Sequence, residues 1–264
     1  MSRLLVLVSL LSVPAFAGAP VTIKGSDTMV ILTQRWAETF MKKKPEVKLQ
    51  VTGGGSGTGL AALISGSTDL ATSSRSIKDA EKAKLPGVVE VPVARDGVTF
   101  FVHESNPVQA LTVEQLKGIY LGDITNWKDV GGPNLPIALY SRESSSGTYV
   151  FVKEHVLGNE DFAPQAQTLP GTAAVVNAVA KEKAGIGYGG AAYAKGVREL
   201  KVKVGKDDVE PTLANIRAGK YPLSRQLFFY LRAKPAGDAA AFIDFCLSDE
   251  GQKLVEAVGY FPIK

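Results

Sequence analysis

The sequence predicts an α/β protein in two lobes, with mostly parallel sheets that carry helices on both faces. Apolar segments of strand length alternate with amphipathic segments of helix length, beginning with residues 21–23 and 28–41. This alternation is typical of βαβ units, whose crossovers make the strands parallel. Two long extended segments, residues 88–103 and 222–232, divide the chain and are expected to cross between the lobes.

The same patterns predict the remaining elements in chain order. Strands are expected at residues 47–51, 69–72, 137–140 and 200–204, a glycine-rich strand or turn at 185–189, and helices at 59–65, 79–84, 149–156, 172–183 and 212–219. A further helix starts at 112–116, and residues 236–258 form one or two helices that end at Gly259.

The two crossings define the expected domain organisation. The first lobe is discontinuous and comprises residues 20–98 and 226–264, whereas residues 99–225 form the second lobe. The first crossing is expected to be interrupted at residues 95–97, where Arg-Asp-Gly follows an apolar run. Because ligands of open α/β sheets bind beyond the carboxyl ends of strands, we expect a ligand cleft between the lobes.

Three predicted strands lead into turns rich in glycine and hydroxyl side chains, each of which opens a helix. These turns are residues 25–29, 53–59 and 141–148. Free backbone N–H groups and the positive end of the helix dipole favour an anion at such a helix start. One such turn is ordinary capping. Three in one chain indicate helix starts that converge on a bound anion.

The third turn also carries a positive charge. Arg142 precedes Ser146, Gly147 and Thr148. A guanidinium offers a planar fork of donors that suits a tetrahedral oxyanion, and Gly147 allows the backbone to approach a ligand closely. We therefore expect Arg142 to contribute opposite charge to the anion site.

Composition excludes several other classes of protein. The chain has 264 residues, of which 45% are hydrophobic, as in ordinary globular proteins. The formal net charge of +4 is mild and the basic residues are scattered, which argues against a nucleic-acid partner. Cys246 stands alone, so no intrachain disulfide is possible, and we expect a buried, inert thiol.

Residues 1–19 have the pattern of a secretion signal peptide. Arg3 precedes an apolar run from Leu4 to Val13, and Ala15-Phe16-Ala17 fits a cleavage site. This apolar run is too short to span a bilayer, and no other apolar segment approaches the length that a membrane span needs. Since no cysteine lies beside the cleavage site, no lipid anchor through cysteine is expected. The mature protein is expected to be exported, soluble and periplasmic.

A secreted serine hydrolase or phosphatase is the competing class. His103 and His155 are the only histidines, and both are expected to have structural roles. Neither Ser56 nor Ser146 lies in a Gly-x-Ser-x-Gly motif, because threonine takes the last position in both cases. No cluster has metal-ligand spacing. We therefore expect a binding protein without catalytic residues, metal or other cofactor.

Together, these segments resemble the substrate-binding proteins of bacterial phosphate ABC importers, which have the two-lobed periplasmic-binding-protein fold of type II. The resemblance covers the whole mature chain. It implies a monomeric receptor that captures inorganic phosphate between the lobes and delivers it to a membrane permease. It rests on residues 25–28, 53–59, 73–75, 95–97, 142–148, 185–188 and 221–225.

The resemblance also implies which residues bind phosphate. The first two turns supply side chains and one backbone amide, and the third turn supplies the guanidinium, two side chains and a second amide. The implied contacts are Ser26, Thr28, the amide of Met29, Ser56, Arg142, Ser146, the amide of Gly147, and Thr148.

One position departs from the family pattern. Well-known members place a carboxylate just after the third strand, where this chain has Ser74 followed by Arg75. That carboxylate accepts a hydrogen bond from monohydrogen phosphate, whereas fully deprotonated sulfate has no proton to donate and is repelled, at a cost to sulfate of about 1–3 kcal/mol or more. Here Ser74 is expected to line the site, and Asp96 and Asp27 are candidate acceptors.

These positions leave alternatives open. Asp27 is more simply a helix N-cap, and Asp96 is equally well part of a turn at the crossing. Arg75 is either a second guanidinium of the site or a surface partner of Asp79. The ligand could also be another oxyanion, such as sulfate or molybdate.

Overall fold

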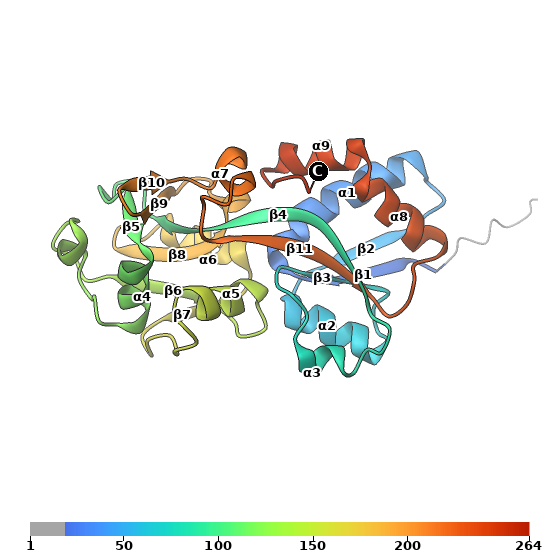
Figure 1. Cartoon of the computed structure of the whole chain (residues 1–264), viewed down its shortest axis with the longest axis horizontal. Coiled ribbons are helices and arrows are strands. Elements are labelled where there is room, and N and C mark those ends of the chain that lie inside the picture. Colours follow the sequence, from blue (N-terminus) through green and yellow to red (C-terminus); the bar gives the residue numbers. More distant parts are fainter. Residues whose placement is uncertain (1–18, 264) are drawn as a thin grey trace, which may run out of the picture.

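Two long strands cross the middle of the molecule and join its two halves (Figure 1). The computed structural model describes residues 19–263, in which residues 89–97 of β4 (Val89–Val102) pair antiparallel with β11 (Ser224–Leu231). The two predicted crossings are therefore present. The predicted interruption at residues 95–97 is wrong, because the backbone there stays extended and pairs with residues 224–226 of β11.

The first half of the molecule is built from both ends of the described chain. Its three strands follow β11 in the order β3, β1, β2 at one end of the sheet. Its elements are β1 (Val21–Gly25), η1 (Asp27–Met29), α1 (Val30–Lys43), β2 (Leu49–Thr52), α2 (Ser56–Ser65), β3 (Leu70–Ser73), α3 (Asp79–Lys82), α8 (Gly237–Leu247) and α9 (Asp249–Val258).

The second half is formed by the middle of the chain. Strands β8, β6 and β7 continue the sheet beyond β4, while β9 pairs with β4, β5 and β10. Its elements are β5 (Ala110–Thr112), α4 (Val113–Leu121), η2 (Trp127–Val130), β6 (Ala138–Arg142), α5 (Gly147–His155), β7 (Gln167–Leu169), α6 (Thr172–Val179), β8 (Gly185–Gly190), η3 (Ala191–Tyr193), β9 (Arg198–Val204), β10 (Asp207–Val209) and α7 (Leu213–Arg217).

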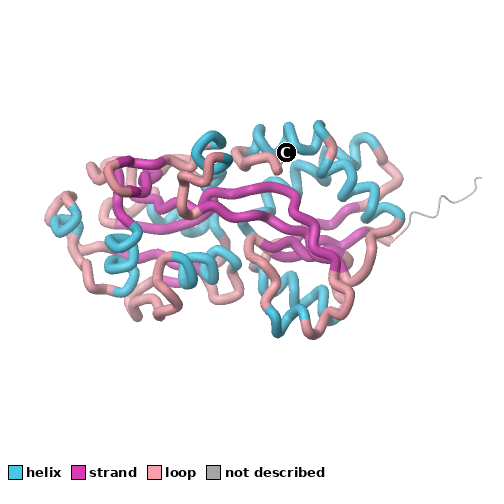
Figure 2. The backbone as a smooth tube through the Cα atoms, in the orientation of Figure 1, coloured by secondary structure: helices cyan, strands magenta, loops and turns pink. Residues whose placement is uncertain are grey.

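The sheet is mixed, which corrects the expectation of mostly parallel sheets. Within each half, β1 pairs in parallel with β2 and β3, and β6 pairs in parallel with β7 and β8. The crossing strands pair antiparallel with one another and with β3 and β8. A chain that leaves the first half along β4 and returns along β11 must run in opposite directions in these two strands. Figure 2 shows them as adjacent extended tubes.

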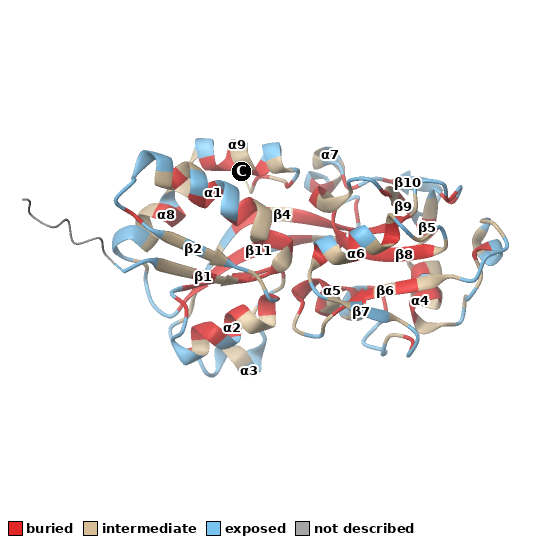
Figure 3. Ribbon diagram, turned by 180° about the vertical axis from the view of Figure 1, so that it is seen from behind, coloured by how far each residue is buried: buried red, intermediate tan, exposed pale blue. Residues whose placement is uncertain are grey.

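Each half has its own hydrophobic core. Trp36 and Phe229 belong to the main cluster of the first half, whereas Phe100, Tyr120 and Trp127 belong to that of the second half. The crossing strands are buried along most of their length, while β1 and β2 are more exposed (Figure 3). The domain boundaries at residues 98/99 and 225/226 stay predictions.

Local sequence places the helix starts that matter for the site. Helix α1 buries Leu32, Trp36 and Phe40, one turn apart, against the first core. Helix α5 is capped by Ser146, whose Oγ accepts from the amides of Thr148 and Tyr149. Each of these helices follows the carboxyl end of a strand, β1 and β6 respectively.

Among residues 19–263, no helix is both long enough and apolar enough to cross a membrane. Residues 1–18 of the predicted signal peptide lie outside the described residues.

Candidate functional site

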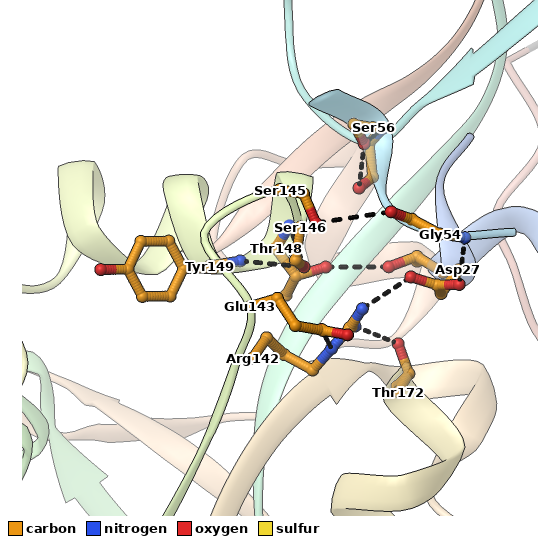
Figure 4. A network of polar contacts seen from close by, with 12 residues as sticks. Asp27, Gly54, Ser56, Arg142, Glu143, Ser145, Ser146, Thr148, Tyr149 and Thr172 are labelled. Atoms are coloured by element: carbon orange, nitrogen blue, oxygen red, sulfur yellow. Dashed lines mark hydrogen bonds and ion pairs between the residues drawn. The ribbon is translucent and has the colours of Figure 1, made fainter. Parts of the chain in front are cut away.

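The three glycine- and hydroxyl-rich turns meet where the two halves touch (Figure 4). Thr28 Oγ1 in η1 lies 2.8 Å from Thr148 Oγ1 in α5. The amide of Gly57, in the first turn of α2, donates to the carbonyl of Ser145 at 2.9 Å. The structure thus brings three helix starts from distant parts of the chain to one place.

Gly147 lies where the halves touch, with no room for a side chain. A Cβ added there would lie 2.3 Å from Ser56 Oγ and 2.6 Å from Ser74 Oγ, distances that no packed side chain tolerates. Any side chain here would force these hydroxyls to move, and glycine lets the start of α5 contact the start of α2 and the end of β3.

The junction contains a cluster of buried hydroxyl groups. Ser56 Oγ accepts from the amide of Ser74 at 3.0 Å, and the two hydroxyls are 3.3 Å apart. The Ser26 hydroxyl is buried and has no hydrogen-bond partner among the described residues. A buried polar group without a partner is costly, so this cluster favours a polar ligand. Its members are Ser26, Thr28, Ser56, Ser74, Ser146 and Thr148, each at most 2% exposed.

Arg142 lies at the end of β6, where its side chain is 1% exposed. Its Nη2 donates to Asp27 Oδ2 at 2.7 Å, its Nη1 to Thr172 Oγ1 at 2.8 Å, and its Nε to Glu143 Oε2 at 3.3 Å. A guanidinium has five N–H donors, so two of them remain for a ligand.

Tyr188 in β8 holds the backbone that carries this guanidinium. Its hydroxyl lies 2.8 Å from Ser141 Oγ and accepts from the Arg142 amide at 3.2 Å. Burial raises the pKa of Tyr188 well above its ordinary value, so the phenol stays neutral. This contact gives a structural role to the glycine-rich strand at residues 185–188.

A second buried guanidinium, which sequence reasoning did not include in the site, belongs to Arg225. Its Nη2 and Nε donate to Asp96 Oδ2 at 2.7 and 3.1 Å, and Nη2 also donates to Thr148 Oγ1 at 3.0 Å. Its Nη1 is buried without a hydrogen-bond partner among the described residues. The guanidinium lies over the Phe151 ring, with Cζ 5.3 Å from the ring centre.

One signal in the sequence could have identified this pair. Arg225 is the only charged residue in β11 and precedes the apolar run at residues 227–231, so a buried charge there needs a partner. Asp96 stands directly opposite it in β4 and is fully buried. Burial raises the pKa of Asp96, while the charge of Arg225 acts in the opposite direction.

Two interpretations of acidic residues are corrected. Asp27 is not an N-cap: its Oδ1 accepts from the amide of Gly54 at 2.8 Å, and its Oδ2 binds Arg142. Ser26 holds the N-cap position instead, without a side-chain capping bond. Asp96 does not lie in a turn, because it is paired within β4.

Other predicted site residues have partners outside the cluster. Arg75 forms a bidentate ion pair with Glu81, at 2.7 and 2.8 Å, and not with Asp79. With Phe151 and other residues, it lines a cavity of about 570 Å³ between the halves. The Met29 amide donates to the Ser26 carbonyl at 2.9 Å, so it is already satisfied within η1.

The site residue Thr172 was also missed. It opens α6 directly after β7 and Gly171, which repeats the strand–turn–helix pattern. Within residues 19–263, no group of three or more His, Cys, Asp or Glu side chains is arranged to hold a metal ion. The ring of His155 stacks on Phe151, and His103 Nδ1 lies 2.8 Å from Ser105 Oγ.

Comparison with known proteins identifies the family of this chain. The model of the PBP superfamily domain matches residues 13–250. The phosphate-binding protein PstS of Pseudomonas aeruginosa is 35% identical over 263 residues, which cover 90% of this chain and 81% of that protein.

Two solved structures are also similar. One is a Clostridium perfringens protein described as a putative phosphate ABC transporter substrate-binding protein with bound phosphate. Its sequence is 34% identical and its TM-score is 0.87, and the match covers 93% of this chain and 100% of the Clostridium protein. The other is an ABC-type phosphate transport receptor from Vibrio cholerae, with 32% identity and a TM-score of 0.74 over 91% and 99% of the two chains. The chain therefore belongs to the PBP superfamily and, within it, to the family of PstS phosphate-binding proteins.

Proposed function

We propose that this protein is an exported receptor that binds inorganic phosphate between its two halves and delivers it to the membrane permease of an ABC importer. The observation that carries the proposal is the buried group of hydroxyls beside the Arg142 guanidinium, at the meeting point of three helix starts. The names of the relatives, which refer to phosphate and to ABC transport, support the same ligand and partner.

The chemistry of the cluster suits a small dianion. Phosphate carries a charge of about −1.5 to −2 near neutral pH and has strong acceptor oxygens. Helix N-termini and hydroxyls donate to such oxygens, and two N–H groups of Arg142 are available for them. The direct ligands in this proposal are Ser26, Thr28, Ser56, Ser74, Arg142, Ser146, the amide of Gly147, and Thr148.

Three residues take supporting positions in the proposal. Asp96 acts through Arg225, because the guanidinium of Arg225 lies between Asp96 and Thr148. Arg75 stands outside the cluster, since Glu81 holds its guanidinium and balances its charge. Met29 fixes η1 through its buried side chain and its bond to Ser26.

The proposal includes a hinge and a cellular location. Strands β4 and β11 are the connections about which residues 20–98 with 226–264 move relative to residues 99–225. Residues 1–19 direct export to the periplasm, where the protein acts as a monomer without a lipid anchor.

Isothermal titration of the purified chain from residue 20 tests the ligand. Phosphate should bind with micromolar or tighter affinity, and an excess of sulfate should leave this binding intact. Tighter binding of sulfate or molybdate than of phosphate would show that this other oxyanion is the ligand. Turnover of p-nitrophenyl phosphate by the purified protein would contradict the assignment as a binding protein.

A further inference from the structure

Asp27 is a carboxylate that contacts both halves of the molecule. Its Oδ1 accepts from the amide of Gly54 at 2.8 Å within the first half, and its Oδ2 accepts from Arg142 Nη2 of the second half at 2.7 Å (Figure 4). Its backbone carbonyl also accepts from the hydroxyl of Tyr193 at 2.6 Å. A single side chain therefore links the second glycine-rich turn to the guanidinium of the third.

The other two partners of Arg142 belong to its own half. Glu143 is the next residue in the chain, and Thr172 opens α6 beside β6. These contacts can persist if the halves separate, whereas the bond to Asp27 requires the halves to be in contact. Asp27 thus makes one orientation of Arg142 depend on closure.

The energetic reason follows from burial. The Arg142 side chain is 1% exposed, and that of Asp27 is 19% exposed. A buried guanidinium that loses its closest carboxylate partner is destabilised, and Glu143, which is more exposed and 3.3 Å away, replaces only part of that charge, so the closed arrangement depends on Asp27. When the halves part, both groups can regain water.

We propose that Asp27 is a positioning residue that aligns Arg142 across the cleft and stabilises the closed arrangement without itself touching the anion. The inference rests on the proposed function, because the aligned guanidinium is the one assigned to phosphate. Apparent affinity is the intrinsic affinity multiplied by the fraction of protein that is competent to bind. Asp27 raises the fraction of protein that is competent to bind, and it slows the release of phosphate more than it speeds phosphate capture.

The variant Asp27→Asn tests the proposal, with Glu143→Gln as its matched control. Both substitutions remove a carboxylate that contacts Arg142, and only Asp27 contacts it from the opposite half. The asparagine oxygen can still accept from Gly54, so the substitution removes mainly the bond between the halves. Small-angle scattering without phosphate, titration with phosphate and stopped-flow release of phosphate are the measurements.

For Asp27→Asn we expect a larger radius of gyration without phosphate and an apparent affinity lower by at least about fivefold, with faster release. For Glu143→Gln, whose side chain is 36% exposed, we expect a change of less than about twofold. The variant Asp27→Glu keeps the charge, and should recover part of the affinity. Such recovery of affinity would show that Asp27→Asn acts through the lost charge that aligns Arg142, and not through a general loss of packing.

The inference is overturned if Asp27→Asn changes neither the release rate nor the radius of gyration, or if Glu143→Gln has the same effect as Asp27→Asn. If the unmodified protein does not bind phosphate, the proposed function fails, and the scattering comparison alone then decides the role of Asp27.

Discussion

The two buried guanidiniums of this protein are held in different ways. Arg225 is paired with Asp96, which stands opposite it on the neighbouring strand, so the register of β4 and β11 fixes the pair. Arg142 is held by Asp27 from the other half of the molecule, as well as by Thr172 and Glu143 from its own half.

This difference separates stability from binding. A pair fixed by strand register exists in any arrangement of the halves, so Arg225 and Asp96 should contribute mainly to folding. A pair formed across the cleft depends on how the halves are arranged, so Arg142 and Asp27 should contribute mainly to ligand affinity. Four experiments can break or sharpen this comparison.

The largest effect is expected from Arg225→Ala. It leaves the fully buried Asp96 without its partner, which should lower the free energy of unfolding by about 3–5 kcal/mol. Urea denaturation measures this loss. The double variant Arg225→Met with Asp96→Leu removes both charges and should recover most of the stability. A loss below about 1 kcal/mol in the single variant would contradict the register-fixed role.

Arg142→Ala should affect binding more than folding. Loss of a buried, hydrogen-bonded charge typically costs about 2–5 kcal/mol of binding free energy, and titration with phosphate should detect it. Unfolding should change less, because Asp27 and Glu143 are 19% and 36% exposed and can be hydrated. An affinity equal to that of the unmodified protein would exclude Arg142 as a ligand.

Gly147→Ala probes closure without removing charge. The added Cβ would collide with the hydroxyls of Ser56 and Ser74 from the opposite half. We expect weaker phosphate binding by about 1–3 kcal/mol, the usual cost of overpacking. The melting temperature without phosphate should change less than the affinity, because separation of the halves relieves the collision at the cost of contacts such as Asp27–Arg142. A lower melting temperature with unchanged affinity would show that the glycine serves the fold.

The smallest effect concerns Glu199 in β9, beside the crossing strand β4. Burial raises its pKa from 4.5 to about 7, and the charges of Glu210 and Asp96 act in the same direction. As pH rises, the Glu199 carboxyl loses its proton near pH 4.5 in the unfolded chain, but only near pH 7 in the folded protein. The free energy of unfolding therefore contains the full contribution of Glu199 below about pH 4.5, and this contribution decreases as pH rises toward 7. Glu199→Gln should remove this decrease, which denaturation at several pH values measures. An unchanged pH profile would place the titrating group elsewhere.

Much of the architecture could be predicted from local patterns. The spacing of Leu32, Trp36 and Phe40 defines the buried face of α1, and the hydroxyl–glycine turns mark the starts of α2 and α5. These signals act over a few residues, through capping and through the period of the helix, so the sequence carries them directly. The Arg142 turn was predicted as a charged helix start for the same reason.

The charge pairing was decided by tertiary structure. Asp27 and Arg142 are 115 residues apart in the chain, and Asp96 and Arg225 are 129 apart. Nothing local distinguishes Asp27 as a partner of Arg142 from Asp27 as an N-cap, or Glu81 from Asp79 as the partner of Arg75. The sequence by itself determined which helix starts exist and that one of them carries a guanidinium. Strand register and the contact between the halves decided which charges meet, because these pairings join segments whose distance in space is set by the whole fold.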